Sequence, residues 1–171
     1  GRTVFANLIH TIVYLLSCNL GEVSVMLGAV VLGLPLPLLP PALLWINIVT
    51  DGLPALALAI DSSDGRTMLK KYQINRTTLL SKENYWWIGV IGFGQAIIAL
   101  GVFAFALSRG LAFGRGAVFT TLVALELCVV FLVRGKHMPA YSNRFLVITV
   151  VVSAALQGII LAVPQIREIF F

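Results

Sequence analysis

The sequence is short of charged residues. Only 11% of its 171 residues are Asp, Glu, Lys or Arg, whereas 59% are hydrophobic. Soluble domains carry about 25% charged residues. A chain with so little polar surface cannot be covered by water, which excludes an ordinary soluble domain and indicates an integral membrane protein. Helices satisfy their own backbone hydrogen bonds in lipid, so the predicted fold class is an all-α membrane protein.

Motifs for catalysis and for cofactor binding are also missing. The chain holds no Gly-rich phosphate loop and no Ser-His-Asp grouping, and its polar links are too short for a nucleotide domain. We therefore expect no catalytic and no cofactor-binding residue within it. The basic residues are sparse and not interleaved with aromatics, so the net charge of +5 does not indicate a nucleic-acid partner.

The two cysteines and the chain start give further limits. Cys18 and Cys128 lie inside apolar runs and are not spaced as a metal or redox pair, so we interpret both as small core hydrophobes. The chain opens Gly-Arg-Thr without an initiator Met, which suggests a fragment or a processed chain.

What the sequence does contain is a series of long apolar stretches. About 20 apolar residues are needed to cross a bilayer as a helix. The stretches predict about five transmembrane helices, at about 2–32, 41–60, 85–107, 116–133 and 145–163. The link at 108–115 is expected to be short, and the links at 61–84 and 134–144 are polar.

The distribution of Lys and Arg predicts the orientation in the membrane. One side would hold most of the basic residues, and cytoplasmic loops carry such an excess. The N-terminus is therefore expected in the cytoplasm. These residues are Arg2, Arg66, Lys70, Lys71, Arg76, Lys82, Arg134, Lys136 and Arg144. The opposite side would hold Arg109, Arg115 and Arg167.

Helix three, at about 85–107, carries two recognisable features. Its first residues, 85–87, are Tyr-Trp-Trp, which is typical of the aromatic belt at a membrane surface. Gly89, Gly92, Gly94 and Gly101 follow along it, and such small residues predict close packing against another helix.

Three acids stand near the middle of apolar runs: Glu22, Asp51 and Glu126. A charged side chain at mid-bilayer costs about 2.5–3.5 kcal/mol on insertion scales, so such residues are functional candidates. The other acids lie in links or at the end of the chain, and we expect them to be solvated. These are Asp61, Asp64, Glu83 and Glu168.

Polar neighbours accompany two of the mid-membrane acids. Asn19 precedes Glu22 by three residues, and Asn47 and Thr50 precede Asp51 on the same helical face. The same helix contains Gly52 and Pro54, and a proline inside a helix clashes with the carbonyl four residues earlier. We therefore expect this second helix to be broken near residues 51–54, and transporters place ion sites at such breaks.

The candidate ligands are all oxygen donors. Asn19, Glu22, Thr50, Asp51 and Glu126 together offer about five to seven side-chain oxygens, and Ca²⁺ takes six to eight. No His or Cys joins them, which argues against Zn²⁺ or Cu⁺. Ligand chemistry alone leaves Ca²⁺, Mn²⁺, Na⁺ and protons open.

Two motifs add a family resemblance. Ser-Cys-Asn-Leu-Gly-Glu-Val at 17–23 and Leu-Trp-Ile-Asn-Ile-Val-Thr-Asp-Gly-Leu-Pro-Ala at 44–55 resemble the Ca²⁺-pumping P-type ATPases of the sarco/endoplasmic-reticulum type and their bacterial relatives. Asn7, residues 14–16 and Ala-Leu-Glu-Leu-Cys at 124–128 are similar to the same family. The likeness implies that residues 1–171 are the C-terminal transmembrane domain of such a pump, from its fifth helix to its ninth.

The resemblance also implies roles for the polar residues. It implies that one Ca²⁺ site is formed by Asn19, Glu22, Thr50, Asp51 and Glu126. It implies a second site with ligands from Asn47 and Asp51, completed by helix four, which this chain lacks. The phosphorylated Asp and the cytoplasmic domains that use ATP and Mg²⁺ would be partners elsewhere in the pump.

Two departures from the family pattern affect these expectations. The segment 61–82 lacks the prolines usual in that family, so its coupling to the cytoplasmic domains could differ. The short link at 108–115 favours a bacterial or archaeal plasma membrane.

Other functions fit the same residues. Five helices with buried acids could form a passive cation channel or a proton-coupled secondary carrier, and a pump could move Mn²⁺ or Na⁺ instead. A purely structural role would require Lys or Arg partners at mid-membrane, and none lies within the predicted spans.

Overall fold

The computed structural model describes residues 2–61, 80–134 and 142–171. Its described residues form helices and contain no strand. The elements in chain order are α1 (Arg2–Val31), α2 (Pro40–Trp45), η1 (Ile46–Asp51), α3 (Gly52–Ala59), α4 (Lys82–Ala106), η3 (Leu107–Arg109), α5 (Leu111–Arg134), α6 (Arg144–Ala162) and α7 (Pro164–Phe170).

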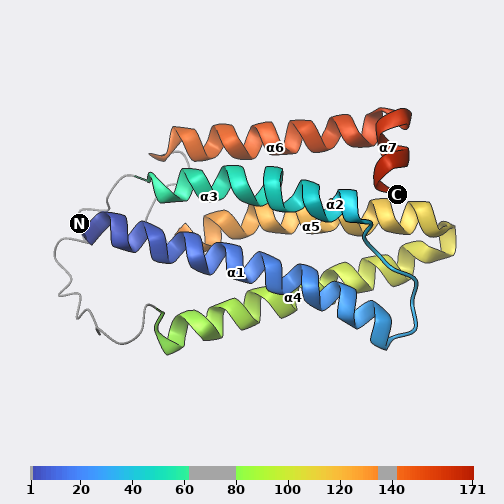
Figure 1. Cartoon of the computed structure of the whole chain (residues 1–171), viewed down its shortest axis with the longest axis horizontal. Helices are drawn as coiled ribbons and strands as arrows, with labels where there is room; N and C mark the ends of the chain where they lie inside the picture. Colours follow the sequence, from blue (N-terminus) through green and yellow to red (C-terminus); the bar gives the residue numbers. More distant parts are fainter. Residues whose placement is uncertain (1, 62–79, 135–141) are drawn as a thin grey trace.

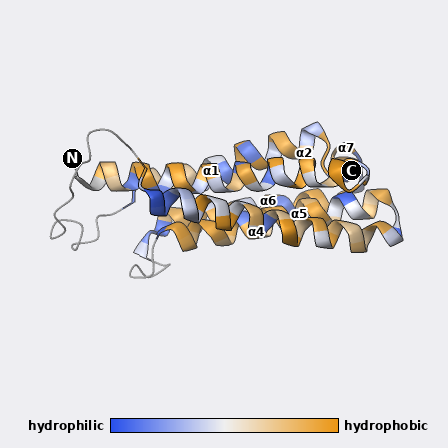
Figure 2. Ribbon diagram, turned by 90° about the horizontal axis from the view of Figure 1, so that it is seen from below, coloured by the Kyte–Doolittle hydropathy of each residue, from blue (hydrophilic) through white to orange (hydrophobic). Residues whose placement is uncertain are grey.

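Five of the helical segments are long and apolar enough to cross a membrane, which confirms the predicted fold class. They run side by side as an elongated bundle, with α2, η1 and α3 joined end to end as the second span (Figure 1). Hydrophobic residues occupy most of the bundle along its length, as the ribbon colours of Figure 2 show. The N-terminus and the start of α4 lie at one end, and α7 crosses the other end beside the C-terminus (Figure 1).

The fourth span begins earlier than expected. Helix α5 starts at Leu111, so residues 111–115 are helical and not part of a link. The turn before it consists of η3 and Gly110, whose φ of 110° is a left-handed conformation that favours glycine. The short helix α7 after the last span was not predicted, and a proline at its first turn starts it.

The second span is not interrupted as expected. Its backbone stays helical through residues 51–54, and the distortion is a π-helical segment, η1, that begins at Ile46. In a π-helix the carbonyl of Val49 would accept from the N–H of residue 54, but Pro54 has none. The hydroxyl of Ser153 donates to this carbonyl at 3.1 Å. Pro54 thus widens the helix without breaking it, because a side chain from α6 replaces the missing donor.

The close packing expected of the glycines on α4 occurs at one of them. A Cβ on Gly92 would lie 2.9 Å from the side chain of Leu20 on α1. Gly89, Gly94 and Gly101 have open space beside them. Among these four glycines only Gly92 contacts α1 closely, but two glycines of α1 contribute as well: a Cβ on Gly21 would lie 2.9 Å from Gln95 of α4, and one on Gly28 would lie 2.5 Å from Leu100. The two helices therefore approach closely through glycines on both sides.

The expectation of solvated acids was wrong for Asp61. This carboxylate pairs with Arg134, and the two side chains are only 5% and 2% exposed. Just after the end of α3, the chain places Asp61 against Arg134, which is the last residue of α5. Asp64 and the basic residues at 66, 70, 71, 76 and 136 lie outside the described residues. Tyr85, Trp86 and Trp87 are exposed at the start of α4, as an aromatic belt would be.

Candidate cation site

Three carboxylates meet inside the bundle, from α1, η1 and α5. One oxygen each of Glu22, Asp51 and Glu126 lies within 4.8 Å of the other two. These residues are 4%, 1% and 0% exposed. Side chains that are far apart in the sequence thus form one buried acidic cluster, which we call the acid cluster.

Protein donors hold one oxygen of each of the first two acids. The amide nitrogen of Asn47 donates to Oε2 of Glu22 at 2.9 Å. The hydroxyl of Tyr14 lies 3.1 Å from Oδ1 of Asp51 and 3.1 Å from the Thr50 carbonyl, and its single proton serves these two acceptors. The one N–H that Pro54 lacks would bond the Val49 carbonyl in a π-helix and the Thr50 carbonyl in an α-helix, and Tyr14 lies within hydrogen-bond distance of the second of these carbonyls.

The third acid follows the same pattern. The hydroxyl of Thr50 lies 3.2 Å from Oε2 of Glu126 and 2.8 Å from the carbonyl of Ile46. The second oxygen of every acid is buried and without a hydrogen-bond partner. These atoms are Oε1 of Glu22, Oδ2 of Asp51 and Oε1 of Glu126. Each acid therefore keeps one oxygen available to a ligand.

Among the residues that the structure describes, the acid cluster has no protein counter-charge. No hydrogen bond or ion pair in the described residues joins Lys or Arg to these acids. Two ionised carboxylates about 4.8 Å apart repel each other by about 3 kcal/mol at the effective dielectric constant of 20 used for proteins. Buried charges are normally paired or coordinate a metal. A purely structural cluster is therefore disfavoured, and a cation or protons would have to neutralise it.

The donor set fits a hard cation. The three acids supply six carboxylate oxygens, and the residues grouped here include no His or Cys. Hard divalent cations such as Ca²⁺ and Mn²⁺ prefer oxygen ligands, and Ca²⁺ takes six to eight of them. The arrangement can therefore hold one such ion among three helices.

The two asparagines differ in their relation to the acid cluster. Asn47 joins it through Glu22, although its side chain is also exposed. Asn19 is exposed and its amide donates to the carbonyl of Leu15 in its own helix, at 2.8 Å. The structure thus brings together every predicted site residue except Asn19, which remains at the surface of the described residues.

Sequence reasoning missed two residues that shape the site. Tyr14 precedes Glu22 on α1 by two steps of four residues, so both side chains lie on the same helical face. This spacing is a signal that the Tyr14 hydroxyl lies on the side of the acids. Ser153 gives no such signal, because its contact with Val49 joins residues 104 positions apart.

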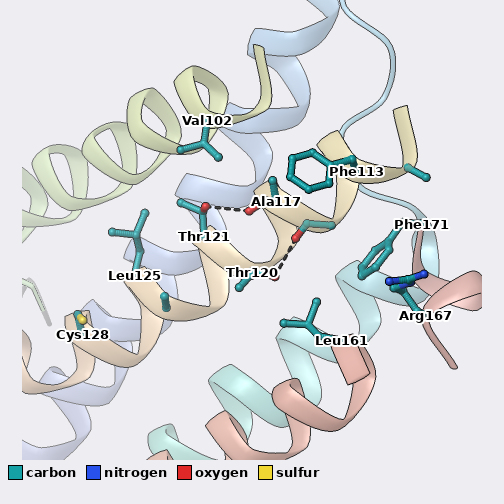
Figure 3. A pocket seen from close by; sticks show the side chains of 13 residues that line it. Val102, Phe113, Ala117, Thr120, Thr121, Leu125, Cys128, Leu161, Arg167 and Phe171 are labelled. Atoms are coloured by element: carbon teal, nitrogen blue, oxygen red, sulfur yellow. Dashed lines mark hydrogen bonds between the residues drawn. The ribbon is translucent and has the colours of Figure 1, made fainter. Parts of the chain in front are cut away.

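A separate cavity of about 800 Å³ lies along the outer face of α5. Figure 3 shows the side chains of Phe113, Thr120 and Cys128 along it. The wall is mainly apolar, the Thr120 hydroxyl is bonded to the backbone of its own helix, and none of the three acids lines it. Cys128 is exposed there, so its prediction as a core residue was wrong, whereas Cys18 is buried.

The fold and the acid cluster define a polytopic membrane protein with an oxygen-lined site between its helices. The family model described as "Cation transporting ATPase, C-terminus" matches residues 35–171. The chain belongs to this family of P-type ATPases.

Curated relatives extend the match over the whole chain. A calcium-transporting ATPase of Bacillus subtilis (strain 168) is 34% identical over 99% of this chain and 20% of its own length. Calcium-transporting ATPase 1 of Bacillus cereus is 27% identical over 99% of this chain and 22% of its own. The endoplasmic-reticulum-type calcium-transporting ATPase 3 of Arabidopsis thaliana is 35% identical over 75% of this chain and 13% of its own length. The chain thus spans about a fifth of the length of its bacterial relatives.

Proposed function

We propose that this chain is the membrane half of an ATP-driven Ca²⁺ pump and that the acid cluster binds the transported ion. The observation that carries the proposal is the unpartnered oxygen on each of three buried acids. The names of the relatives support Ca²⁺ as the ion, since several are calcium-transporting ATPases.

The proposed ligands fall into two groups. Glu22, Asp51 and Glu126 would bind the ion directly, and Thr50 would either bind it or hold Glu126 in place. Asn19 would join them only if its side chain left the carbonyl of its own helix. A second Ca²⁺ site would use Asn47 on the exposed side of η1 together with the buried Asp51, with further ligands from a helix outside this chain.

The remaining parts of the pump would supply the energy. ATP hydrolysis with Mg²⁺ in cytoplasmic domains would move the helices that carry the acids, and protons would replace Ca²⁺ on the carboxylates in the return step. The partners are the lipid bilayer, the other transmembrane helices and those domains. We place the protein in a bacterial or archaeal plasma membrane because of the short link after the third span. The Lys and Arg bias described above places its N-terminal side in the cytoplasm.

The test is ion binding by the full-length protein in lipid nanodiscs. Binding of ⁴⁵Ca²⁺ and Ca²⁺-stimulated phosphorylation from ATP are measured for the wild type, Asp51→Asn and Glu126→Gln. We expect Asp51→Asn to abolish Ca²⁺-stimulated phosphorylation and Glu126→Gln to raise the half-saturating Ca²⁺ concentration at least tenfold. Glu83→Gln, which changes an exposed acid at the start of α4, is the matched control and should bind like the wild type.

Other outcomes would decide against the proposal. Unchanged Ca²⁺ dependence in Asp51→Asn would rule out the acid cluster as the site. Mn²⁺ or Na⁺ binding that Ca²⁺ does not displace would assign a different ion. Ca²⁺ flux through liposomes without ATP would favour the channel or the secondary carrier, which membership of an ATPase family disfavours.

A further inference from the structure

A second buried polar cluster lies at the end of the bundle where α3 and α5 finish. Arg134 contacts both carboxylate oxygens of Asp61, through Nε on Oδ2 and through Nη2 on Oδ1 at 3.1 Å. Asn143 at the start of α6 donates to Oδ1 of Asp61 at 3.0 Å and to the carbonyl of Ala57 at 3.1 Å. Asn7 of α1 donates to the Asp61 carbonyl at 2.8 Å. We call these four polar side chains the polar clamp.

The polar clamp joins the same helices that carry the acid cluster. The second span holds Asp51 and ends at Ala59, two residues before Asp61, and α5 holds both Glu126 and Arg134. The two helices run in the same direction (Figure 1). At a rise of about 1.5 Å per residue, Ala59 at the end of α3 lies about 12 Å from Asp51 along the span, and Arg134 lies about 12 Å from Glu126 along α5.

The geometry of the ion pair restricts sliding between these helices. A guanidinium that contacts both oxygens of a carboxylate fixes the orientation of the two groups as well as their distance. A shift of half a helical turn, about 2.7 Å, would break both contacts. Buried ion pairs contribute little to stability compared with apolar replacements, and setting register is their best-attested use.

We infer that Asp61 and Arg134 are positioning residues for the acid cluster. Their ion pair sets the axial register of the second span against α5, and this register sets the separation of Asp51 from Glu126. Asn143 donates to the carboxylate of Asp61, and Asn7 donates to the backbone carbonyl of Asp61. The register is therefore also fixed relative to α6 and α1. The effect on ion binding rests on the function proposed above, whereas the effect on register does not.

The first experiment measures Ca²⁺ binding to the full-length protein in nanodiscs, alongside its thermal stability. Asp61→Asn and Arg134→Gln should each raise the half-saturating Ca²⁺ concentration at least tenfold, while the folded fraction keeps its full binding capacity. The exchange of the two charges, Asp61→Arg with Arg134→Asp, should return the value to within threefold of the wild type. Arg144→Gln is the control, because it removes an exposed charge close by and should stay within twofold.

The second experiment measures the register directly. Spin labels replace Leu56 on α3 and Leu132 on α5, which are 55% and 68% exposed, in a Cys128→Ser background. We expect Asp61→Asn to shift or broaden the distance distribution by 2 Å or more. This readout does not depend on Ca²⁺, and it decides the inference if the exchange variant does not fold.

The outcomes separate the inference from the proposed function. If Asp61→Asn lowers thermal stability but leaves both the Ca²⁺ affinity and the label distance unchanged, the ion pair only stabilises the fold and the inference is wrong. If the wild type and Asp51→Asn bind Ca²⁺ alike, the proposed function fails, and the label distance alone then confirms or refutes the register.

Discussion

Replacement of Tyr14 by Phe tests how the protein tolerates Pro54 in the middle of a span. The variant removes one hydroxyl that lies 3.1 Å from the Thr50 carbonyl and 3.1 Å from Asp51, and it leaves the ring in place. Tyr14 is fully buried, so water does not replace the hydroxyl. A buried acceptor left without a partner costs about 1–3 kcal/mol, and we expect Tyr14→Phe to destabilise the membrane region by that amount.

The double variant with Pro54→Ala gives the sharper measurement. Alanine at position 54 restores a backbone N–H within α3, and in the α-helical pattern of α3 this N–H bonds to the Thr50 carbonyl four residues earlier. Tyr14→Phe should therefore cost less in the Pro54→Ala background, with a coupling energy of about 0.5–3 kcal/mol. The assay is unfolding of the full-length protein in mixed detergent micelles, followed by tryptophan fluorescence.

A matched control isolates the buried contact. Tyr85→Phe removes the same hydroxyl from a residue that is 61% exposed at the start of α4, and it should change stability by less than about 0.5 kcal/mol. Equal effects of Tyr14→Phe and Tyr85→Phe would refute the reasoning. Strict additivity of Tyr14→Phe and Pro54→Ala would show that the hydroxyl does not substitute for the donor that proline lacks.

Two further changes test contacts elsewhere in the bundle. Gly92→Ala should destabilise the protein by about 1–3 kcal/mol, because its Cβ would lie 2.9 Å from Leu20, whereas Gly94→Ala has open space and should have little effect in the same unfolding assay. Ser153→Ala should cost about 1 kcal/mol by removing the donor to the Val49 carbonyl, and Ser108→Ala, which affects an exposed hydroxyl, should be close to neutral.

The sequence alone predicts the fold class, because few backbone structures can satisfy their hydrogen bonds in lipid and the long apolar runs have the length of helices. It was also sufficient to select Glu22, Asp51 and Glu126, since acids at mid-membrane are costly. The structure brings these three side chains together, and their role in ion binding stays a prediction.

The remaining features depend on which helices are neighbours. The ion pair of Asp61 with Arg134 joins residues 73 positions apart, whereas the local sequence suggests a solvated carboxylate and a basic residue at the cytoplasmic side. The Val49 carbonyl in the π-helical segment η1 accepts from Ser153 on another helix. The local sequence does not reveal this donor, so Gly52 and Pro54 alone suggest an interrupted span. Asn19 was grouped with Glu22 by helical spacing, but spacing does not show which side of the helix the neighbours cover.

The π-helical segment η1 also affects how this region is compared between relatives. A π turn contains about one residue more than an α turn, and each residue of an α-helix corresponds to a rotation of about 100°. A relative whose segment is regular α-helix would therefore present its Asp51 equivalent about 100° away, unless it has one residue fewer between positions 46 and 51. When a relative with a π-helical segment is aligned with one whose segment is α-helical, a one-residue gap at this point keeps the site residues paired. An alignment without the gap would pair residues that face different neighbours.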